Sequence, residues 1–214
     1  MSKKPEEREL GYKILTPLMR AAFKLFYSPE IIGAEKIPED SSIVIAGNHK
    51  HVYDQCLTIM ATKRVIHYMA KKEYFDGWLA PLFRAVGCIP VDRSRKDFSS
   101  AMSAMKVLKK EGAIGIFPEG TRNKTEDFLL RFKTGAVSMA KKTDSYIVPF
   151  GLTGDYTFRS KNLKIRYGEP FKVGDMTVEE ANAKLRTRLN ALCLKTSTKK
   201  TKNVNTHNMA GDKK

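Results

Sequence analysis

A histidine and an aspartate five residues apart, His49 and Asp54, have the ingredients of a general base and its orienting partner. A neutral imidazole can accept a proton near pH 7, because its reference pKa is about 6.5. A carboxylate that accepts the other ring N–H fixes the tautomer and stabilises the imidazolium. On one ideal helix, five residues would set the two side chains about 140° apart. The spacing therefore predicts a corner, with His49 in a loop and Asp54 in the first turn of the next helix.

Alternatives to this interpretation stay open at the same place. A histidine and an aspartate at this spacing also occur as an ordinary surface pair. The neighbouring His51 could compete for Asp54, or it could join His49 as a His-x-His pair of metal ligands. The other histidines, His67 and His207, supply no further ligand at a recognisable spacing, so we expect no metal site.

No protein nucleophile accompanies the pair. The sequence lacks a G-x-S-x-G motif, and the three cysteines lie far apart without a CxxC spacing. An odd number of separated cysteines argues against a disulfide framework and favours a reducing compartment. We therefore expect the hydroxyl that is activated to belong to the substrate. The three cysteines are Cys56, Cys88 and Cys193.

Two arginines, Arg93 and Arg122, could bind a phosphate through their forked guanidinium groups. Either arginine alone is more simply interpreted as a solvated surface residue. Gly120 would let backbone N–H groups approach the same phosphate. Gly115 and Gly120 have the spacing of P-loop glycines, but Thr121-Arg122 replaces the Lys-Ser/Thr pair of that motif, so we reject a P-loop.

The elements that must position these residues alternate between strands and helices from residue 41 onward. This alternation predicts an α/β fold, with a single mostly parallel or mixed sheet covered by helices on both faces. Ligands bind outside the carboxyl ends of strands in such sheets, which collects His49, Arg93 and Glu119 at one end. The predicted strands are 42–46, 65–69, 88–91, 113–117, 146–150 and 163–167, and the predicted helices are 52–62, 74–85, 98–110, 135–142 and 178–194.

Residues 10–27 form an amphipathic basic segment. At 100° per residue Lys13, Arg20 and Lys24 fall within about 40° of one another, and the apolar residues spread over the opposite half. Pro17 allows either one kinked helix or two short ones. Periodicity leaves two functions open, a helix packed on the protein core and a helix lying in a membrane interface.

The composition points to anionic partners. The 214 residues include 39 lysines and arginines against 23 acidic residues, a net charge of +16. The segment 195–214 contributes +5, so +11 belongs to the rest of the chain. Nucleic acid, phosphorylated small molecules and an acidic membrane fit this charge, but the absence of an RNP, zinc-finger or helix-turn-helix signature argues against nucleic acid. We expect a membrane-associating segment 1–40, an α/β domain 41–194 and a disordered basic tail 195–214.

Four sequence blocks occur in an order and spacing that resemble the glycerophospholipid acyltransferases of the 1-acyl-glycerol-3-phosphate acyltransferase type. Residues 48–54 match the NHx4D block of that family, and residues 87–93, GCIPVDR, match its second block. Residues 117–122, FPEGTR, match the third block, and residues 147–150, IVPF, match the fourth. The resemblance covers about residues 10–175, and it departs from the family at His51, where serine is usual.

The resemblance implies that a fatty acyl group moves from a thioester of coenzyme A or acyl carrier protein to the sn-2 hydroxyl of lysophosphatidate. It assigns His49 as the base and Asp54 as its orienting partner. It implies no metal or other cofactor, and it implies work at an anionic membrane surface, peripheral or monotopic on the cytoplasmic face. The implied phosphate site contains Arg93, Glu119, Gly120, Thr121 and Arg122, with Lys72 and Lys133 as possible additions.

Three rival functions remain at this point. A related acyltransferase could acylate glycerol 3-phosphate or another lysolipid. A hydrolase could use His49 to activate water on a thioester, which leaves the arginines without a role. A non-catalytic basic protein would keep its function when His49 is lost.

Overall fold

The computed structural model describes residues 5–78, 80–92 and 98–194, and within them seven strands form one sheet. Arg93 and the predicted tail 195–214 lie outside the described residues. The strands lie in the order β1-β7-β6-β2-β5-β3-β4. Their bounds are β1 Glu30–Ile32, β2 Ile43–Gly47, β3 Ile66–Lys71, β4 Ile89–Val91, β5 Ala113–Ile116, β6 Tyr146–Thr153 and β7 Lys164–Tyr167.

The sheet is mixed, as predicted. β6 and β7 pair antiparallel. The other neighbouring strands of the described sheet pair parallel. Each of the six predicted strands is present within a few residues of its expected bounds. The strand β1 was not predicted, because a three-residue run after Pro29 is too short to show alternation. It lies in the segment 1–40 and adds a parallel edge strand beside β7.

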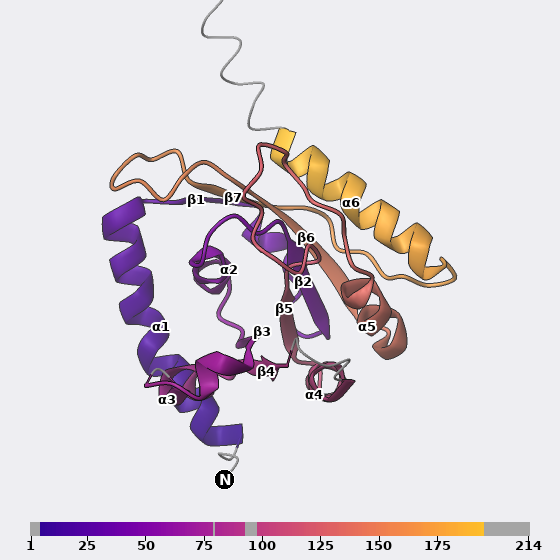
Figure 1. The fold of residues 1–214 in the computed structure, drawn as a ribbon, viewed down its shortest axis with the longest axis horizontal. Helices are drawn as coiled ribbons and strands as arrows, with labels where there is room; N and C mark the ends of the chain where they lie inside the picture. Colours follow the sequence, from indigo (N-terminus) through magenta and orange to yellow (C-terminus); the bar gives the residue numbers. More distant parts are fainter. Residues whose placement is uncertain (1–4, 79, 93–97, 195–214) are drawn as a thin grey trace, which may run out of the picture.

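Helices cover both faces of the sheet (Figure 1). One face packs against α4 (Phe98–Leu108), α5 (Gly135–Thr143) and α6 (Val178–Leu194). The other face packs against α2 (Asp54–Ala61) and the C-terminal half of α1 (Pro5–Tyr27). The remaining helical segments are α3 (Ala80–Ala85) and the 3₁₀ turns η1 (Ala34–Lys36) and η2 (Lys72–Phe75).

The predicted helix 74–85 is wrong as a single element. A turn at Gly77, closed by the N–H of Ala80 on the carbonyl of Gly77, separates η2 from α3. Glycine costs about 1 kcal/mol relative to alanine in a helix interior, so the interruption falls where the helix is weakest.

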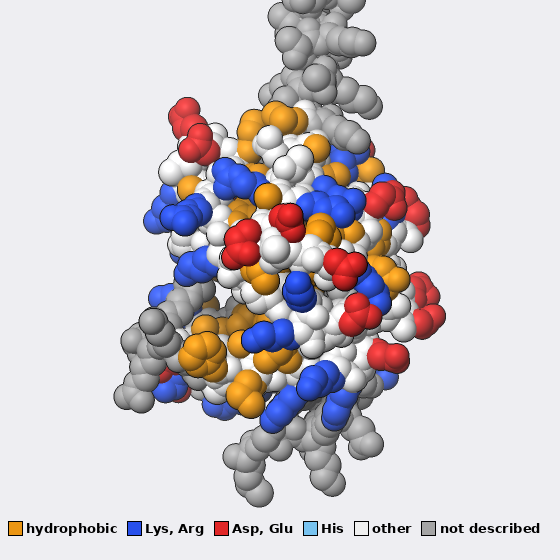
Figure 2. All heavy atoms as spheres, turned by 90° about the vertical axis from the view of Figure 1, so that its right-hand side faces the viewer, with side chains coloured by type: hydrophobic (Ala, Val, Ile, Leu, Met, Phe, Trp, Pro, Cys, Tyr) orange, Lys and Arg blue, Asp and Glu red, His pale blue; other side chains and the backbone are white. Residues whose placement is uncertain are grey.

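The central strand β2 shows why the sheet needs two helical layers. Val44 and Ala46 belong to the core under α4, α5 and α6, whereas Ile43 and Ile45 belong to the core on the α2 side. All four side chains are fully buried. A strand buried on both faces is apolar at every position, as expected for a parallel sheet. The outer surface on the α4–α6 side carries charged side chains of both signs, with hydrophobic ones in small groups (Figure 2).

The N-terminal segment forms one continuous helix, α1, with Pro17 inside it. Its inner face includes the buried Tyr12 and Thr16, and Phe23 packs against the core on the α2 side. Arg20 also points inward, donating hydrogen bonds to the carbonyls of Ile59, at 2.9 Å, and Thr62. Arg20 therefore lies apart from the exposed Lys13 and Lys24, although the three are close in helical angle, because the carbonyls at the end of α2 need donors and Arg20 supplies them.

The outer face of α1 remains apolar and open. Ile14, Leu18, Leu25 and Phe26 are 63%, 76%, 58% and 48% exposed. The helix therefore packs on the body with an aromatic and polar face and presents its aliphatic residues outward. Among the described helices, none combines the length and hydrophobicity that crossing a bilayer requires.

Candidate active site

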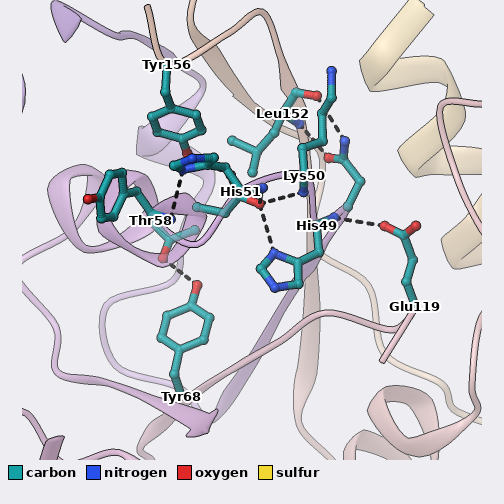
Figure 3. A network of polar contacts seen from close by, with 11 residues as sticks. His49, Lys50, His51, Thr58, Tyr68, Glu119, Leu152 and Tyr156 are labelled. Atoms are coloured by element: carbon teal, nitrogen blue, oxygen red, sulfur yellow. Dashed lines mark hydrogen bonds and ion pairs between the residues drawn. The ribbon is translucent and has the colours of Figure 1, made fainter. Parts of the chain in front are cut away.

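Three loops meet at the edge of the sheet where the parallel strands β2, β5 and β6 end. The loop after β2 carries His49, the loop after β5 carries Glu119, and the loop after β6 carries Tyr156 (Figure 3). We call residues 48–54, which join β2 to α2, the dyad corner. Its position at the carboxyl ends of parallel strands is the usual place for a ligand site in such sheets.

His49 and Asp54 are joined by a hydrogen bond of 2.9 Å from Nδ1 of the ring to Oδ2 of the carboxylate. The predicted corner is present, since His49 lies in the loop and Asp54 is the first residue of α2. An ionised carboxylate only accepts hydrogen bonds, so Nδ1 carries the proton and Nε2 has a lone pair available for a substrate proton. The His49 side chain is 18% exposed, whereas that of Asp54 is buried, which leaves the ring accessible and its partner protected.

Asp54 receives three further hydrogen bonds. The backbone N–H groups of Lys50 and His51 donate to Oδ2 at 2.6 and 2.8 Å, and the hydroxyl of Tyr156 donates to Oδ1 at 2.7 Å. With the bond from His49, four donors converge on one carboxylate. A buried charge is tolerated only when it is paired and hydrogen-bonded, and these donors meet that requirement.

The backbone of His49 is held from both sides. Its N–H donates to Oε1 of Glu119 at 2.8 Å, and its carbonyl accepts the N–H of Asn123 at 2.6 Å. The imidazole stacks on the Phe117 ring, with centroids 4.0 Å apart and planes 9° from parallel. The ring therefore has little freedom to turn away from Asp54.

The side chain of Glu119, predicted for the phosphate site, binds backbone N–H groups. Its second oxygen, Oε2, accepts the N–H of Leu130 at 2.9 Å, so both oxygens bind backbone groups of two loops. Burial raises the pKa of Glu119, and the backbone hydrogen bonds partly offset this effect. A carboxylate engaged in this way offers no donor to a phosphate, so its contacts assign Glu119 to holding His49 and the 123–132 loop in place.

Two buried asparagines also organise the site. The Asn48 side chain accepts the N–H of Leu152 at 2.6 Å and donates to its carbonyl at 3.0 Å, which joins the ends of β2 and β6. The Asn123 side chain accepts from Thr125 and donates to the carbonyl of Asp127. Sequence reasoning gave neither residue a role. The sequence signal that could have indicated a role was position, since Asn48 precedes His49 and Asn123 follows Arg122.

The ring of His51 does not compete for Asp54. It stacks on the Tyr156 ring, with centroids 4.4 Å apart, and its Nδ1 accepts the N–H of Tyr53 at 3.4 Å. Among the described residues, no group of three or more His, Cys, Asp or Glu side chains is arranged to hold a metal ion. His51 thus contacts the site in two ways: its backbone N–H donates to Asp54, and its ring stacks on Tyr156.

The residues predicted to bind phosphate lie on the turn after β5. The N–H of Gly120 closes this turn on the carbonyl of Phe117 at 3.0 Å, and Gly120 has a φ of +69°. A Cβ at Gly120 would lie 2.8 Å from Cε of Lys133, so glycine permits both the backbone conformation and the approach of that lysine. Thr121, Arg122 and Lys133 are exposed. The structure thus brings Lys133 to the turn, as the sequence proposed.

Lys72 lies at the carboxyl end of β3, where its Nζ is 3.9 Å from Oδ2 of Asp92, just after β4. Arg93 follows Asp92 directly but is outside the described residues. The structure therefore joins the loops after β3 and β4 through Lys72, and the predicted role of Arg93 stays a prediction.

Comparisons with known proteins agree on one family. The sequence model of the Acyltransferase family matches residues 28–153, more than half of the chain. A 1-acyl-sn-glycerol-3-phosphate acyltransferase of Bacillus subtilis is 33% identical over 170 residues, covering 77% of this chain and 84% of that protein. A Borreliella burgdorferi protein of the same name is 33% identical over 141 residues, covering 64% of this chain and 56% of its own length.

A solved structure has the same fold. The 1-acyl-sn-glycerophosphate acyltransferase PlsC from Thermotoga maritima superposes with a TM-score of 0.73 at 21% identity, covering all of this chain and 86% of that one. The fold agreement, the family match and the His49–Asp54 pair at the carboxyl ends of the strands lead to one conclusion. The chain belongs to the acyltransferase family.

Proposed function

We propose that this protein transfers a fatty acyl group from a thioester of coenzyme A or acyl carrier protein to the sn-2 hydroxyl of lysophosphatidate, giving phosphatidate. The observation that carries the proposal is the buried Asp54 bonded to Nδ1 of the partly exposed His49, which leaves the Nε2 lone pair to act as a base. The names of the relatives from Bacillus subtilis and Borreliella burgdorferi support lysophosphatidate as the acceptor.

The proposed reaction needs one base and a good leaving group. Nε2 of His49 takes the proton of the sn-2 hydroxyl while its oxygen attacks the thioester carbonyl. Collapse of the tetrahedral intermediate breaks the carbon–sulfur bond, and the thiolate takes the proton from the imidazolium. Asp54 stabilises the imidazolium in between and keeps its ring orientation. The reaction as written uses no metal, cofactor or acyl-enzyme intermediate.

The acceptor phosphate is proposed to lie at the turn after β5. There the hydroxyl of Thr121 and the cations Arg122 and Lys133 can donate to its oxygens, and Gly120 leaves room for Lys133 to approach. Arg93 and Lys72, from the loops after β4 and β3, are the remaining candidates. Glu119 contributes by positioning the two loops rather than by touching phosphate.

The outer face of α1 is proposed to lie in a membrane interface. Its exposed aliphatic residues would enter the acyl region, and the exposed Lys13 and Lys24 would meet anionic headgroups. Trp78, which is 87% exposed, comes from the turn just before α3, a helix that packs against α1. Tryptophan favours the headgroup level of a bilayer, so this position suits the same surface. We propose peripheral or monotopic binding at the cytoplasmic face.

One assay separates the proposed reaction from its rivals. The purified full-length protein is incubated with lysophosphatidate and an acyl thioester, and phosphatidate and free thiol are followed together. We expect thiol and phosphatidate to form in equal amounts, and only when acceptor is present. Thiol and free fatty acid released regardless of acceptor would indicate a hydrolase. Faster turnover with glycerol 3-phosphate or another lysolipid would change the acceptor.

A further inference from the structure

The hydroxyl of Tyr156 reaches the dyad from a distant part of the chain. It donates to Oδ1 of Asp54 at 2.7 Å, whereas His49 and the two backbone N–H groups occupy Oδ2 (Figure 3). Tyr156 follows β6, 102 residues after Asp54. It therefore supplies the bond to the oxygen that the dyad corner itself leaves open.

The Tyr156 ring is clamped by aromatic neighbours. His51 stacks on one side with centroids 4.4 Å apart, and Tyr27 meets the ring edge to face at 5.5 Å. Tyr53 makes a further edge contact at 6.1 Å. A ring held by three others keeps its hydroxyl aimed at Asp54 before substrate arrives, which is the condition for a preorganised site.

The loop that carries Tyr156 is anchored to the end of α1. The N–H of Arg159 donates to the carbonyl of Phe26 at 2.8 Å, and the rings of Phe158 and Phe26 lie 5.7 Å apart. The loop is therefore held at Tyr156 by the surrounding rings, and at Phe158 and Arg159 by the end of α1. The position of the hydroxyl is thus set by α1 and by the loop together.

Tyr156 remains a hydrogen-bond donor across the working pH range. Burial, together with the negative charge of Asp54, raises its pKa well above the ordinary value for tyrosine. Because the phenol stays protonated, it can donate to Oδ1 of Asp54.

Resting on the proposed function, we propose that Tyr156 is a positioning residue that fixes the Asp54 carboxylate so that Oδ2 stays aligned with Nδ1 of His49. It acts through Asp54 and does not touch the substrate. The His51 ring stacks on the Tyr156 ring and helps to keep it in place. This contact gives a role to the histidine that replaces the usual serine of the family.

The test removes one oxygen atom. Tyr156→Phe keeps the ring and its stacking, and we expect kcat to fall by about tenfold with the acceptor KM unchanged, at the low end for the loss of one hydrogen bond to a charged group. Tyr53→Phe is the matched control, because it removes a hydroxyl from the same aromatic cluster without touching the bonds of Asp54. Circular dichroism and thermal unfolding check that both variants are folded.

A second readout is independent of turnover. We expect the Nδ1 proton of His49 to give a downfield proton NMR resonance because it is bonded to a carboxylate, and we expect this resonance to shift in Tyr156→Phe but not in Tyr53→Phe. A raised KM with unchanged kcat, or a resonance identical to that of the unmodified protein, would overturn the proposal. If the protein uses another acceptor, the resonance still decides the role of Tyr156, so the two proposals fail separately.

Discussion

In the dyad corner, the polar side chains of Asn48 and Asp54 are buried, whereas along α1 leucine, isoleucine and phenylalanine side chains are exposed. Asp54 is 0% exposed, while Leu18 is 76% exposed. Both regions reverse the usual distribution, in which carboxylates are solvated and large apolar side chains are covered. The corner meets the cost of a buried charge with four internal donors. The outer face of α1 has no comparable cover within the described residues, so its exposure favours a partner outside the chain.

This comparison predicts different consequences for the two regions. Changes in the corner should affect the rate of the chemical step, because the groups there act on one another at fixed distances. Changes on the outer face of α1 should affect binding to membranes and leave the rate of the chemical step unchanged. The experiments below are arranged from the largest expected effect to the smallest.

The largest effect is expected for His49→Ala. Loss of a general base lowers turnover by at least about 10²-fold, and folding should persist because the imidazole is partly exposed. Turnover with lysophosphatidate and an acyl thioester measures the change. His51→Ser is the matched control and should be far milder. Near-normal turnover in His49→Ala, or collapse only in His51→Ser, would assign the base to another group.

Arg122→Ala should act on acceptor binding. A charge-assisted contact with phosphate is worth roughly 1.5 to 3 kcal/mol, so the acceptor KM should rise by about ten- to a hundredfold with little change in kcat. The comparison uses a neutral acceptor without phosphate, whose KM should hardly change. Equal losses with both acceptors would mean that Arg122 serves the structure or the phosphates of the donor.

Leu18→Ser tests the outer face of α1. The side chain is largely exposed, and transfer of a leucine from water into an apolar environment is worth about 1.5 kcal/mol or more, so affinity for anionic vesicles should fall by about tenfold. Sedimentation with vesicles measures binding, and turnover of a monomeric short-chain substrate should stay unchanged.

Leu194→Ser, on the helix that covers the opposite face of the sheet, is the control and should bind vesicles normally. Binding should also weaken in high salt, because attraction between lysines and headgroups is screened. If Leu18→Ser binds as well as the unmodified protein, the outer face of α1 is not the membrane contact.

The smallest effect is expected from thiol reagents. Burial raises the pKa of Cys56 and Cys88 to about 12, above the ordinary value of 9.0, so little thiolate is present at pH 8. Treatment with N-ethylmaleimide, followed by its removal, should leave turnover nearly unchanged. Rapid inactivation at pH 8 without unfolding would indicate a cysteine at the reaction centre.

Features that depend on neighbouring residues were predicted from the sequence, whereas features that depend on contacts between distant segments were not. Strands such as β2 and β6 were predicted because buried runs of Ile, Val and Ala carry a local signal. The corner at His49 was predicted from the five-residue spacing alone. The direction of Arg20 was not, because its partners are carbonyls of α2 about 40 residues away, and charge periodicity on α1 says nothing about them.

Glu119 and Asn123 illustrate the same limit inside a motif. The sequence places both beside the proposed phosphate turn, but the Glu119 side chain binds the N–H groups of His49 and Leu130, and the Asn123 side chain binds the carbonyl of Asp127. A carboxylate in a basic sequence block can be interpreted as a ligand or as a support, and only the positions of the surrounding N–H groups distinguish these roles.

The sequence by itself determined the α/β class, six of the seven described strands and the loops that carry the chemistry, because periodicity and strand ends are local properties of the chain. Only the tertiary structure decided how Asp54 is held, which face of α1 is covered and that Tyr156 completes the dyad. Those features depend on contacts between segments distant in the sequence, 102 residues apart for Tyr156 and Asp54, and their geometry is set by the packing of the sheet and its helices.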